Sequence, residues 1–338
     1  MRAAVIERHG TPPAIGERPP PAGSEAHALV STTAAPVTPL DILCATGKSY
    51  FGPPPLPYVP GVQGVGVVQD AEGLTGGTRV WFPTTAGMAP GDGSLAEQVL
   101  LPESELIALP DGVEDTLVAA LGLSAIAAWT ALTWKAGLRP DENVLVLGGG
   151  SVVGQVAIQA ARLCGAGQVV AASRSSRAQE RAKACGADAV VALRDDDEPD
   201  ELAGRLANAC ARDVDVVIDP LCGVPATAAL QLLAPGGRLV NLGSSAGDTA
   251  TFSSATVRSR SARVLGYTNN EISTEQKGEA LLAVLRHAAA GRLSVDHEVV
   301  PLDGLPDAWE RQAQGLAERR IVVHFTARGG QVGELPSP

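Results

Sequence analysis

Short apolar runs alternate with helix-like segments through the second half of the chain. The runs are rich in Val and Leu and lack strict alternation, which is typical of strands buried on both faces of a parallel sheet. They occupy residues 143–148, 168–173, 188–193, 214–220, 238–243 and 263–267. Apolar residues recur at helical spacing within 152–167, 175–188, 200–213 and 224–237. Six strands joined by helices predict an α/β fold with a doubly wound parallel sheet.

The first 110 residues or so have a different pattern. Segments rich in Pro and Gly separate short strand-like runs at 26–35, 64–68, 78–82 and 96–101, which indicates a β-rich region with long loops. After residue 267 the pattern predicts a helix, a strand, a second helix and a last strand, at 275–293, 297–302, 305–315 and 320–325. We expect these late elements to pack on the N-terminal part. The expected domains are therefore 1–120 with 268–330, 121–267, and a disordered tail at 331–338.

Charge and composition limit the classes of partner and the compartment that we expect for this protein. The chain has 338 residues, which is longer than a chain with one hydrophobic core usually is. It has 37 acidic and 26 basic side chains and a net charge of −11. This balance argues against nucleic acid or an anionic membrane as a partner. No apolar run approaches 18 residues and the N-terminus lacks a cleavable signal pattern, so we expect a cytoplasmic protein. The five cysteines are scattered without a C-x-x-C pair, as expected for free thiols in a reducing compartment.

A glycine-rich turn follows the first of the six predicted strands. At such a turn glycines allow a tight bend and let a pyrophosphate approach the N-terminus of the next helix. A serine stands at the middle position of the G-x-G-x-x-G pattern, where its Cβ takes up room but its hydroxyl could donate to a phosphate oxygen. The alternative is a purely structural glycine turn. The expected cofactor residues here are Gly149, Gly150, Ser151, Val152, Val153 and Gly154.

The end of the second strand indicates which dinucleotide would bind. NAD sites usually have an acidic residue there, about 20 residues beyond the loop, to hold the ribose hydroxyls. This chain instead has Ser173, Arg174 and Arg177 and no carboxylate, which suits the 2′-phosphate of NADPH. The alternative is an ordinary solvated helix start. The missing acid also disfavours an S-adenosylmethionine site.

The chain resembles the medium-chain dehydrogenase/reductases of the zinc-independent, quinone-oxidoreductase type. The resemblance rests on segments that follow one another along nearly the whole chain, at 39–50, 56–68, 93–102, 127–166, 214–223 and 232–247. It implies a GroES-like catalytic domain interrupted by a Rossmann domain, with catalysis in the cleft between the two. It also implies dimers formed through the edge strand at 263–267.

Zinc-dependent relatives carry ligands at positions where this chain has Thr38, Val62 and Gln63. Valine cannot bind zinc, and threonine and glutamine lack the thiolate and carboxylate that the site requires. The cysteine-rich lobe that holds a second zinc in those relatives would fall at about 80–100, where this chain has no cysteine. We therefore expect no metal.

The resemblance also places individual residues. It puts Tyr50 and Asp41 near the substrate and nicotinamide, with Thr38 and Gln63 beside them. Tyr50 could give a proton to a carbonyl oxygen or could simply anchor its loop by packing, and Asp41 could instead cap the helix that begins near it. Relatives usually have Asn-Pro where this chain has Thr38-Pro39, which puts one polar contact in doubt. On the nicotinamide side the resemblance implies Gly243, Ser244, Ser245 and Asn269.

These observations favour an NADPH-dependent, zinc-independent reductase. Without a Lewis acid to polarise an alcohol oxygen, hydride transfer to an already electrophilic quinone or α,β-unsaturated carbonyl is the favoured reaction. One alternative is a tailoring reductase with a single unsaturated substrate in a biosynthetic pathway. Another is a nucleotide-binding protein without turnover, as Ser151 and Thr38 would permit.

Overall fold

The computed structural model describes residues 1–326, so the tail expected at 331–338 lies outside the described residues. The chain divides into two compact units. Unit 1 contains Met1–Gly122 together with the segment that starts at Asp296, and unit 2 contains Leu123–Val295. Each unit is described by itself.

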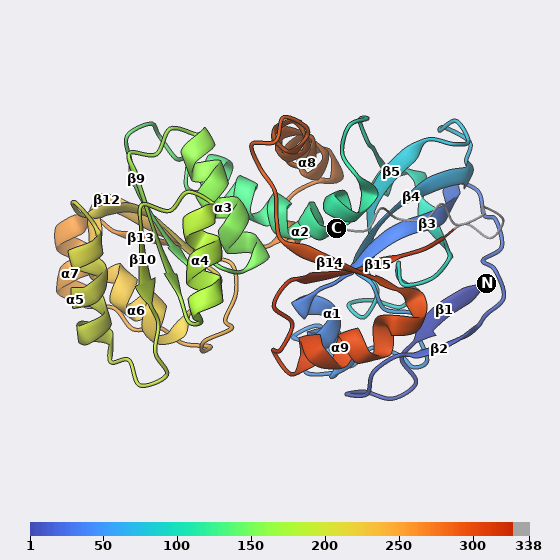
Figure 1. Cartoon of the computed structure of the whole chain (residues 1–338), viewed down its shortest axis with the longest axis horizontal. Coiled ribbons are helices and arrows are strands. Elements are labelled where there is room, and N and C mark those ends of the chain that lie inside the picture. The colour runs from blue at the N-terminus through green and yellow to red at the C-terminus, as the bar shows by residue number, and fades with distance from the viewer. Residues whose placement is uncertain (327–338) are drawn as a thin grey trace, which may run out of the picture. The chain divides into compact units, whose positions relative to one another are not determined.

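Unit 2 contains the predicted six-stranded parallel sheet (Figure 1). Its strands are β8 (Asn143–Leu147), β9 (Gln168–Ser173), β10 (Ala189–Ala192), β11 (Val214–Asp219), β12 (Leu233–Asn241) and β13 (Arg263–Gly266). They lie in the order β10-β9-β8-β11-β12-β13, and every neighbouring pair is parallel. The direction of winding reverses between β8 and β11, which makes their carboxyl ends the switch point where such sheets bind ligands.

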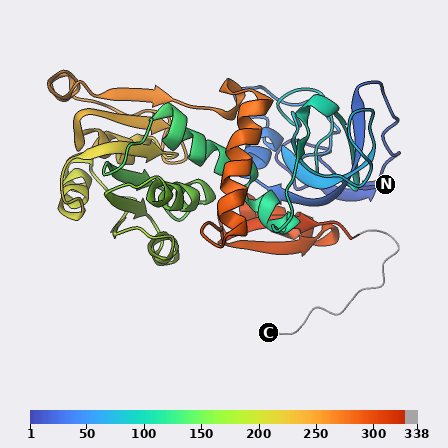
Figure 2. The ribbon, with the colours of Figure 1, turned by 90° about the horizontal axis from the view of Figure 1, so that it is seen from above.

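Helices cover both faces of this sheet. They are α3 (Val152–Leu163), α4 (Ser176–Ala184), α5 (Pro199–Ala209), α6 (Gly223–Leu230) and α7 (Ser254–Arg260). Helix α3 packs beside α4 and α5 beside α6, as Figure 1 shows. Strand β13, orange in Figure 2, lies at one edge of the sheet, and its Val264 is 57% exposed. The predicted doubly wound fold is thus confirmed.

The segment from 268 to 295, which we expected in the β-rich domain, groups with unit 2. It contains helix α8 (Thr274–Ala289). The rings of Trp129 and His287 lie 5.6 Å apart, and Gln159 on α3 exchanges two hydrogen bonds with the backbone of Ser294, of 2.8 and 3.0 Å. These contacts join α8 and its flanks to the parallel-sheet unit, and the return to unit 1 follows Val295.

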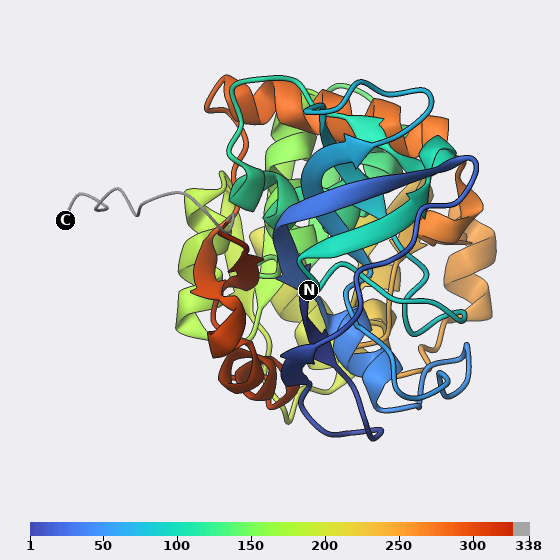
Figure 3. The same ribbon diagram turned by 90° about the vertical axis from the view of Figure 1, so that its right-hand side faces the viewer.

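Unit 1 is built on a sheet of antiparallel character (Figure 3). Its order is β14-β15-β3-β4-β5-β7, with β6 paired to β3. The strands are β3 (His27–Val37), β4 (Gln63–Asp70), β5 (Arg79–Pro83), β6 (Gln98–Pro102), β7 (Ile107–Ala108), β14 (His297–Pro301) and β15 (Arg320–His324). The C-terminal strand β15 pairs antiparallel with β3, so chain segments nearly 300 residues apart share one sheet.

The remaining elements of unit 1 close its core. The pair β1 (Arg2–Val5) and β2 (Ala14–Glu17) forms a small separate sheet. Helices α1 (Pro39–Ala45) and α9 (Leu305–Ala313) pack against each other. The buried cluster beneath them includes Ile6, Leu95 and Trp309. Burial of such side chains from both ends of the chain stabilises the discontinuous unit.

Helix α2 (Asp115–Thr130) and the π-helical turn Ala131–Lys135 follow β7. Among the described residues this is the single helical stretch long and apolar enough to cross a membrane by length and composition, and 61% of its most apolar window is buried within the structure. The helix is broken at Gly122, whose φ of 30° and ψ of −131° are not helical. The boundary between the two units falls directly after this residue.

Candidate functional site

The glycine-rich turn of unit 2 joins β8 to α3. A Cβ added to Gly149 would lie 2.7 Å from the Cβ of Ala171, and one added to Gly154 would lie 2.3 Å from the carbonyl oxygen of Gly148. Real Cβ contacts are never this short, so the turn, the sheet and the helix approach one another closely only because these positions are glycine. The geometry fits the close-packed turn of a dinucleotide site.

Ser151 is the N-cap of α3. Its Oγ accepts a hydrogen bond from the N–H of Gly154 (3.1 Å) and donates one to the carbonyl oxygen of Gly148 (2.8 Å). The serine at the imperfect position of the motif therefore holds the loop closed on the helix. Its hydroxyl hydrogen is already engaged within the loop.

Two N–H groups at the start of α3 have no partner in the described part of the chain. The backbone nitrogens of Val152 and Val153 have no hydrogen-bond acceptor within residues 1–326. The helix has 12 residues, and its N-terminus carries a partial positive charge. These groups could hold the pyrophosphate of a dinucleotide.

The end of β9 supplies the next part of the site. The Oγ of Ser173 accepts a hydrogen bond from the N–H of Gly150 (3.1 Å) and is buried. This serine therefore joins the glycine-rich loop to the end of β9. Arg174 and Arg177 are exposed at the start of α4. No carboxylate among the described side chains lies within ion-pair distance of Arg174.

Arg181 is a residue that sequence reasoning missed. It lies one helical turn after Arg177, and its Nε donates to the carbonyl oxygen of Gly150 (3.3 Å). Its side chain is half-buried and pairs with no acidic side chain of the described part of the chain. The i, i+4 spacing from Arg177 could have suggested that both cations face the loop. Arg181 thus contacts the glycine-rich loop, and Arg174 and Arg177 come shortly before it in the chain.

The loops after β11 and β12 contain the residues expected beside the nicotinamide. The carbonyl oxygen of Gly243 accepts from Asn241 Nδ2 (2.9 Å), and Ser245 Oγ donates to the carbonyl oxygen of Pro220 (3.2 Å). Ser244 is exposed on the same loop. The loop of Gly243 to Ser245 is thus tied to the turn that follows β11.

Asn269 has both ends of its side chain engaged within unit 2. Its Oδ1 accepts from the hydroxyl of Tyr267 (2.9 Å), and its Nδ2 donates to the carbonyl oxygen of Leu123 (3.0 Å). These bonds give Asn269 a role in holding the segment before α8 to α2. Burial raises the pKa of Tyr267 to about 12, so its hydroxyl keeps its proton.

Thr38 and Asp41 of unit 1 form a capping box at the start of α1. Asp41 Oδ2 accepts from the N–H of Thr38 (2.7 Å) and from its hydroxyl (2.6 Å), while Oδ1 accepts from the N–H groups of Gly61 (3.1 Å) and Val62 (2.9 Å). The carboxylate is only 2% exposed. Four donors on one buried carboxylate join α1 to the segment that leads into β4, which favours a structural role.

Arg320 on β15 is a buried cation that the strand pattern did not single out. Its Nη1 donates to the carbonyl oxygen of Val37 (3.0 Å), and its charge acts on Asp41. Burial lowers the pKa of Arg320 to about 10, against the opposing effect of Asp41. Burial likewise raises the pKa of Asp41, although its hydrogen bonds and Arg320 oppose the shift.

Gln63 is buried in the wall of the same region. Its Oε1 accepts from the indole N–H of Trp81 (3.2 Å), and the side chain is 1% exposed. A Cβ on Gly122 would lie 1.9 Å from this Oε1, so the glycine at the break in α2 makes room for the amide. Val62 beside it is buried and apolar.

Tyr50 lies on the loop after α1 and is 80% exposed. Its ring stacks obliquely on that of Phe51, with centroids 4.2 Å apart. The structure therefore joins Thr38 to Asp41, places Gln63 next to Val62, which Asp41 also binds, and leaves Tyr50 on an accessible loop. Within residues 1–326, no group of three His, Cys, Asp or Glu side chains is placed to hold a metal ion.

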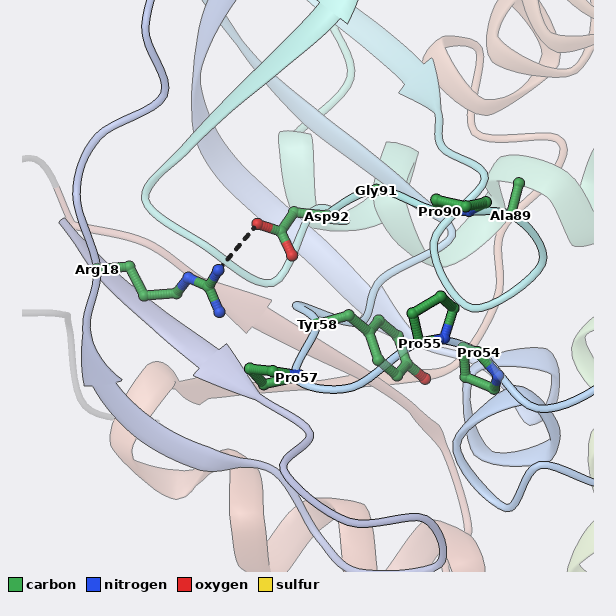
Figure 4. A pocket seen from close by; sticks show the side chains of 9 residues that line it. All are labelled: Arg18, Pro54, Pro55, Pro57, Tyr58, Ala89, Pro90, Gly91 and Asp92. Atoms are coloured by element: carbon green, nitrogen blue, oxygen red, sulfur yellow. Dashed lines mark ion pairs between the residues drawn. The ribbon is translucent and has the colours of Figure 1, made fainter.

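A pocket of about 240 Å³ opens on unit 1 (Figure 4). Arg18 and Asp92 form an ion pair of 3.6 Å at its rim, and Tyr58 forms part of its wall. The other lining residues are Pro54, Pro55, Pro57, Ala89, Pro90 and Gly91. None of the four expected substrate-side residues lines it, so this pocket is not part of the candidate site.

Two family models match the chain. The alcohol dehydrogenase GroES-like domain matches residues 24–111, and the zinc-binding dehydrogenase domain matches residues 152–284. A quinone oxidoreductase from Lama guanicoe is 28% identical over 72% of this chain and 73% of the relative.

Solved structures agree with these matches. A crystal structure of an NAD-dependent alcohol dehydrogenase has 29% identity and a TM-score of 0.82 over 96% of this chain and all of that one. The quinone oxidoreductase from Thermus thermophilus, solved also with NADPH, has 27% identity and a TM-score of 0.76 over the same shares. The expected resemblance is confirmed: the chain is an oxidoreductase-family protein that belongs to the medium-chain dehydrogenase/reductases and is quinone oxidoreductase-like.

Proposed function

We propose that this protein is an NADPH-dependent reductase that delivers hydride to a quinone or an α,β-unsaturated carbonyl without zinc. The observation that carries the proposal is the combination in unit 2 of two N–H groups without an acceptor at the start of α3 with Arg181 on the glycine-rich loop and Arg174 before it. Cationic side chains and helix N-termini are the groups that phosphates prefer. The quinone oxidoreductase relatives support the reaction class.

The choice of NADPH over NADH rests on the end of β9. An NAD site needs a carboxylate there for the ribose hydroxyls, and this chain has Ser173 followed by Arg174. Arg177 and Arg181 add two further cations on one face of α4. Guanidinium groups bind phosphate with paired hydrogen bonds, so the set suits a 2′-phosphate.

The absence of a zinc-dependent mechanism is proposed from the residues themselves. Thr38 and Gln63 are neutral, and both are engaged in hydrogen bonds within unit 1. Val62 offers no ligand atom at all. Thiolate, imidazole and carboxylate are the groups that zinc requires, so the acceptor must already be electrophilic.

In the proposed reaction NADPH, when bound, supplies the hydride. Tyr50 is the proposed proton donor, since its phenol is accessible on a loop of unit 1 and could hydrogen-bond to a carbonyl oxygen. Thr38, Asp41 and Gln63 are proposed to shape the region by holding α1, the start of β4 and Trp81 in place. Ser151 keeps the phosphate loop closed on α3.

Substitution of the arginines tests the proposed preference for NADPH. Arg174→Ala combined with Arg177→Ala removes two charge-assisted contacts to a 2′-phosphate, each worth about 1.5–3 kcal/mol. The dissociation constant of NADPH should therefore rise by at least about a hundredfold, while that of NADH stays nearly unchanged. Lys183→Ala, which removes an exposed cation further along the same helix, is the matched control. An equal loss for both cofactors would refute the 2′-phosphate assignment.

We also propose a cytoplasmic homodimer formed through β13. An unpaired strand edge with an exposed Val264 is a surface that proteins usually cover. Pairing two copies across a twofold axis would cover it on both. Light scattering during size-exclusion chromatography should give twice the chain mass, and Val264→Lys should reduce it to the chain mass.

A panel of simple quinones and enones separates a general reductase from a tailoring enzyme with one substrate. Turnover of several panel members supports the general reductase. Tight NADPH binding without turnover of any of them supports the pathway-specific enzyme or the catalytically silent protein.

A further inference from the structure

A buried carboxylate joins the two loops at the carboxyl ends of β11 and β12. Asp219 is the last residue of β11 and is 1% exposed. Its Oδ1 accepts hydrogen bonds from the N–H groups of Leu221 (3.0 Å) and Cys222 (2.8 Å). One oxygen of this side chain therefore holds the turn that follows the strand.

The other oxygen reaches the neighbouring strand. Asn241, the last residue of β12, donates from Nδ2 to Asp219 Oδ2 (2.8 Å) and to the carbonyl oxygen of Gly243 (2.9 Å). A single amide group thus connects the turn after β11 to the loop after β12. Removing the amide of Asn241 leaves the buried Oδ2 of Asp219 without this hydrogen bond.

The backbone of this turn needs such support. Cys222 has φ 56° and ψ −153°, a conformation that residues with a side chain rarely adopt. The next residue, Gly223, has φ 61°, and a Cβ on it would lie 2.8 Å from the carbonyl oxygen of Ala246. The N–H of Ala246 in turn donates to the carbonyl oxygen of Leu221 (2.8 Å). The two loops are therefore packed directly on each other in a strained arrangement.

The pair of loops lies at the switch point of the sheet. Strands β8 and β11 are neighbours, and a Cβ on Gly148 would lie 3.2 Å from a methyl group of Leu221 and 3.4 Å from Pro220. The turn that Asp219 holds therefore contacts the glycine-rich loop. Open parallel sheets bind their ligands at this place.

We propose that Asp219 is a positioning residue for the nicotinamide half of the cofactor. Through its link to Asn241 it fixes the turn from Pro220 to Gly223 against the loop from Gly243 to Ala246, so that both present one rigid surface to the ring. The inference rests on the proposed function, because it assumes a dinucleotide at this sheet. With the cofactor in that place, the nicotinamide half lies against these loops and the adenosine half against α3 and the arginines.

The test separates the two halves of the cofactor. In Asp219→Asn, Oδ1 can still accept from Leu221 and Cys222, but the new amide nitrogen faces the amide nitrogen of Asn241, so the link between the loops is lost. NADPH and 2′,5′-ADP, which lacks the nicotinamide half, are titrated onto the folded protein. We expect the dissociation constant of NADPH to rise about tenfold, as for the loss of one buried hydrogen bond to a charged group, and that of 2′,5′-ADP to stay unchanged.

The matched control lies on the same strand. Asp215 is near the amino end of β11, where its carboxylate accepts from the N–H of Asn143 (2.8 Å), and Asp215→Asn should leave both dissociation constants unchanged. If Asp219→Asn does not fold, Asn241→Ala removes the same link from the other side and keeps the turn after β11. The same split between the two ligands is expected from it.

Each outcome is decisive. An unchanged affinity for NADPH in a folded variant overturns the positioning role, and an equal loss for NADPH and 2′,5′-ADP reduces Asp219 to a general structural residue. In both cases wild-type protein still binds NADPH, so the proposed function stands. If wild-type protein binds neither ligand, the proposed function fails and the inference fails with it.

Discussion

The variant Asp41→Asn distinguishes two roles for the buried carboxylate of unit 1, stabilising the fold or acting on the substrate. The substitution keeps the shape of the side chain and removes its charge. In the native protein each oxygen accepts two hydrogen bonds, Oδ2 from Thr38 and Oδ1 from Gly61 and Val62. An amide has one oxygen, so whichever way it turns, two donors face an N–H₂ group.

The cost follows from these contacts. A buried donor left without an acceptor costs about 1–3 kcal/mol, although the hydroxyl of Thr38 can rotate away. With the amide oxygen on Gly61 and Val62, the backbone N–H of Thr38 is the donor left without an acceptor, and we expect the free energy of unfolding of unit 1 to fall by about 1–3 kcal/mol.

Thermal unfolding followed by circular dichroism measures this loss. At about 2–4 °C per kcal/mol for a unit of this size, the first transition should fall by about 2–12 °C. Asp92→Asn is the control, because Asp92 also accepts a backbone N–H in unit 1, that of Val59 (2.8 Å), but is exposed. The activity of folded Asp41→Asn should stay within about tenfold of wild type, since general acid catalysis is worth more. A variant of unchanged stability that has lost turnover would refute the structural reading.

Three further predictions concern single side chains. Ser151→Ala should lower the free energy of unfolding by about 1 kcal/mol through loss of the N-cap. Because the hydroxyl is engaged within the loop, the NADPH dissociation constant should change by less than threefold. A larger change would mean that the Ser151 hydroxyl binds the phosphate. Burial alone would raise the pKa of Glu142, but hydrogen bonds from Arg238 and from a backbone N–H lower it overall. Ionised Glu142 therefore stabilises the fold above the unfolded pKa of about 4.3, and this contribution is lost as pH falls below that value. In Glu142→Gln the free energy of unfolding, measured by urea titration, should depend less steeply on pH in the acid range, and an equally steep profile would contradict this. Tyr50→Phe should lower kcat by about a hundredfold at unchanged NADPH affinity. Tyr58→Phe is the control, because it removes a buried hydroxyl that has no partner among the described residues, and it should leave kcat unchanged. Equal kcat values for the two variants would exclude Tyr50 as the proton donor.

The parallel sheet was predictable because its strands are buried on both faces. Runs such as 143–148 and 214–220 are largely Val, Leu and Ile, and the strands found there are almost entirely buried. Helix α7 was not predicted, because none of its residues is buried and an element without an apolar face leaves no periodic pattern. The helix at 274–289 was predicted, but its unit was not, since the partners of this helix and of the segment after it, Trp129 and Gln159, lie more than 100 residues away in sequence.

The candidate site was predictable where a motif fixes the backbone. The glycine turn and its helix start were expected from their spacing, and the structure adds that Ser151 closes the loop. Arg181 and Asp219 were not singled out, because their contacts with Gly150 and Asn241 depend on the packing of separate elements. A side chain that acts through tertiary contact carries no local signal in one sequence.

The most direct measurement of the central claim is a titration of wild-type protein with NADPH and NADH, followed by fluorescence, with quinones and enones added to the saturated complex. The account predicts saturable binding that is clearly tighter for NADPH, and oxidation of the bound NADPH when an electrophilic acceptor of this class is added. Binding that does not distinguish the two cofactors would contradict the arginine site. Failure to bind either nucleotide would contradict the account as a whole.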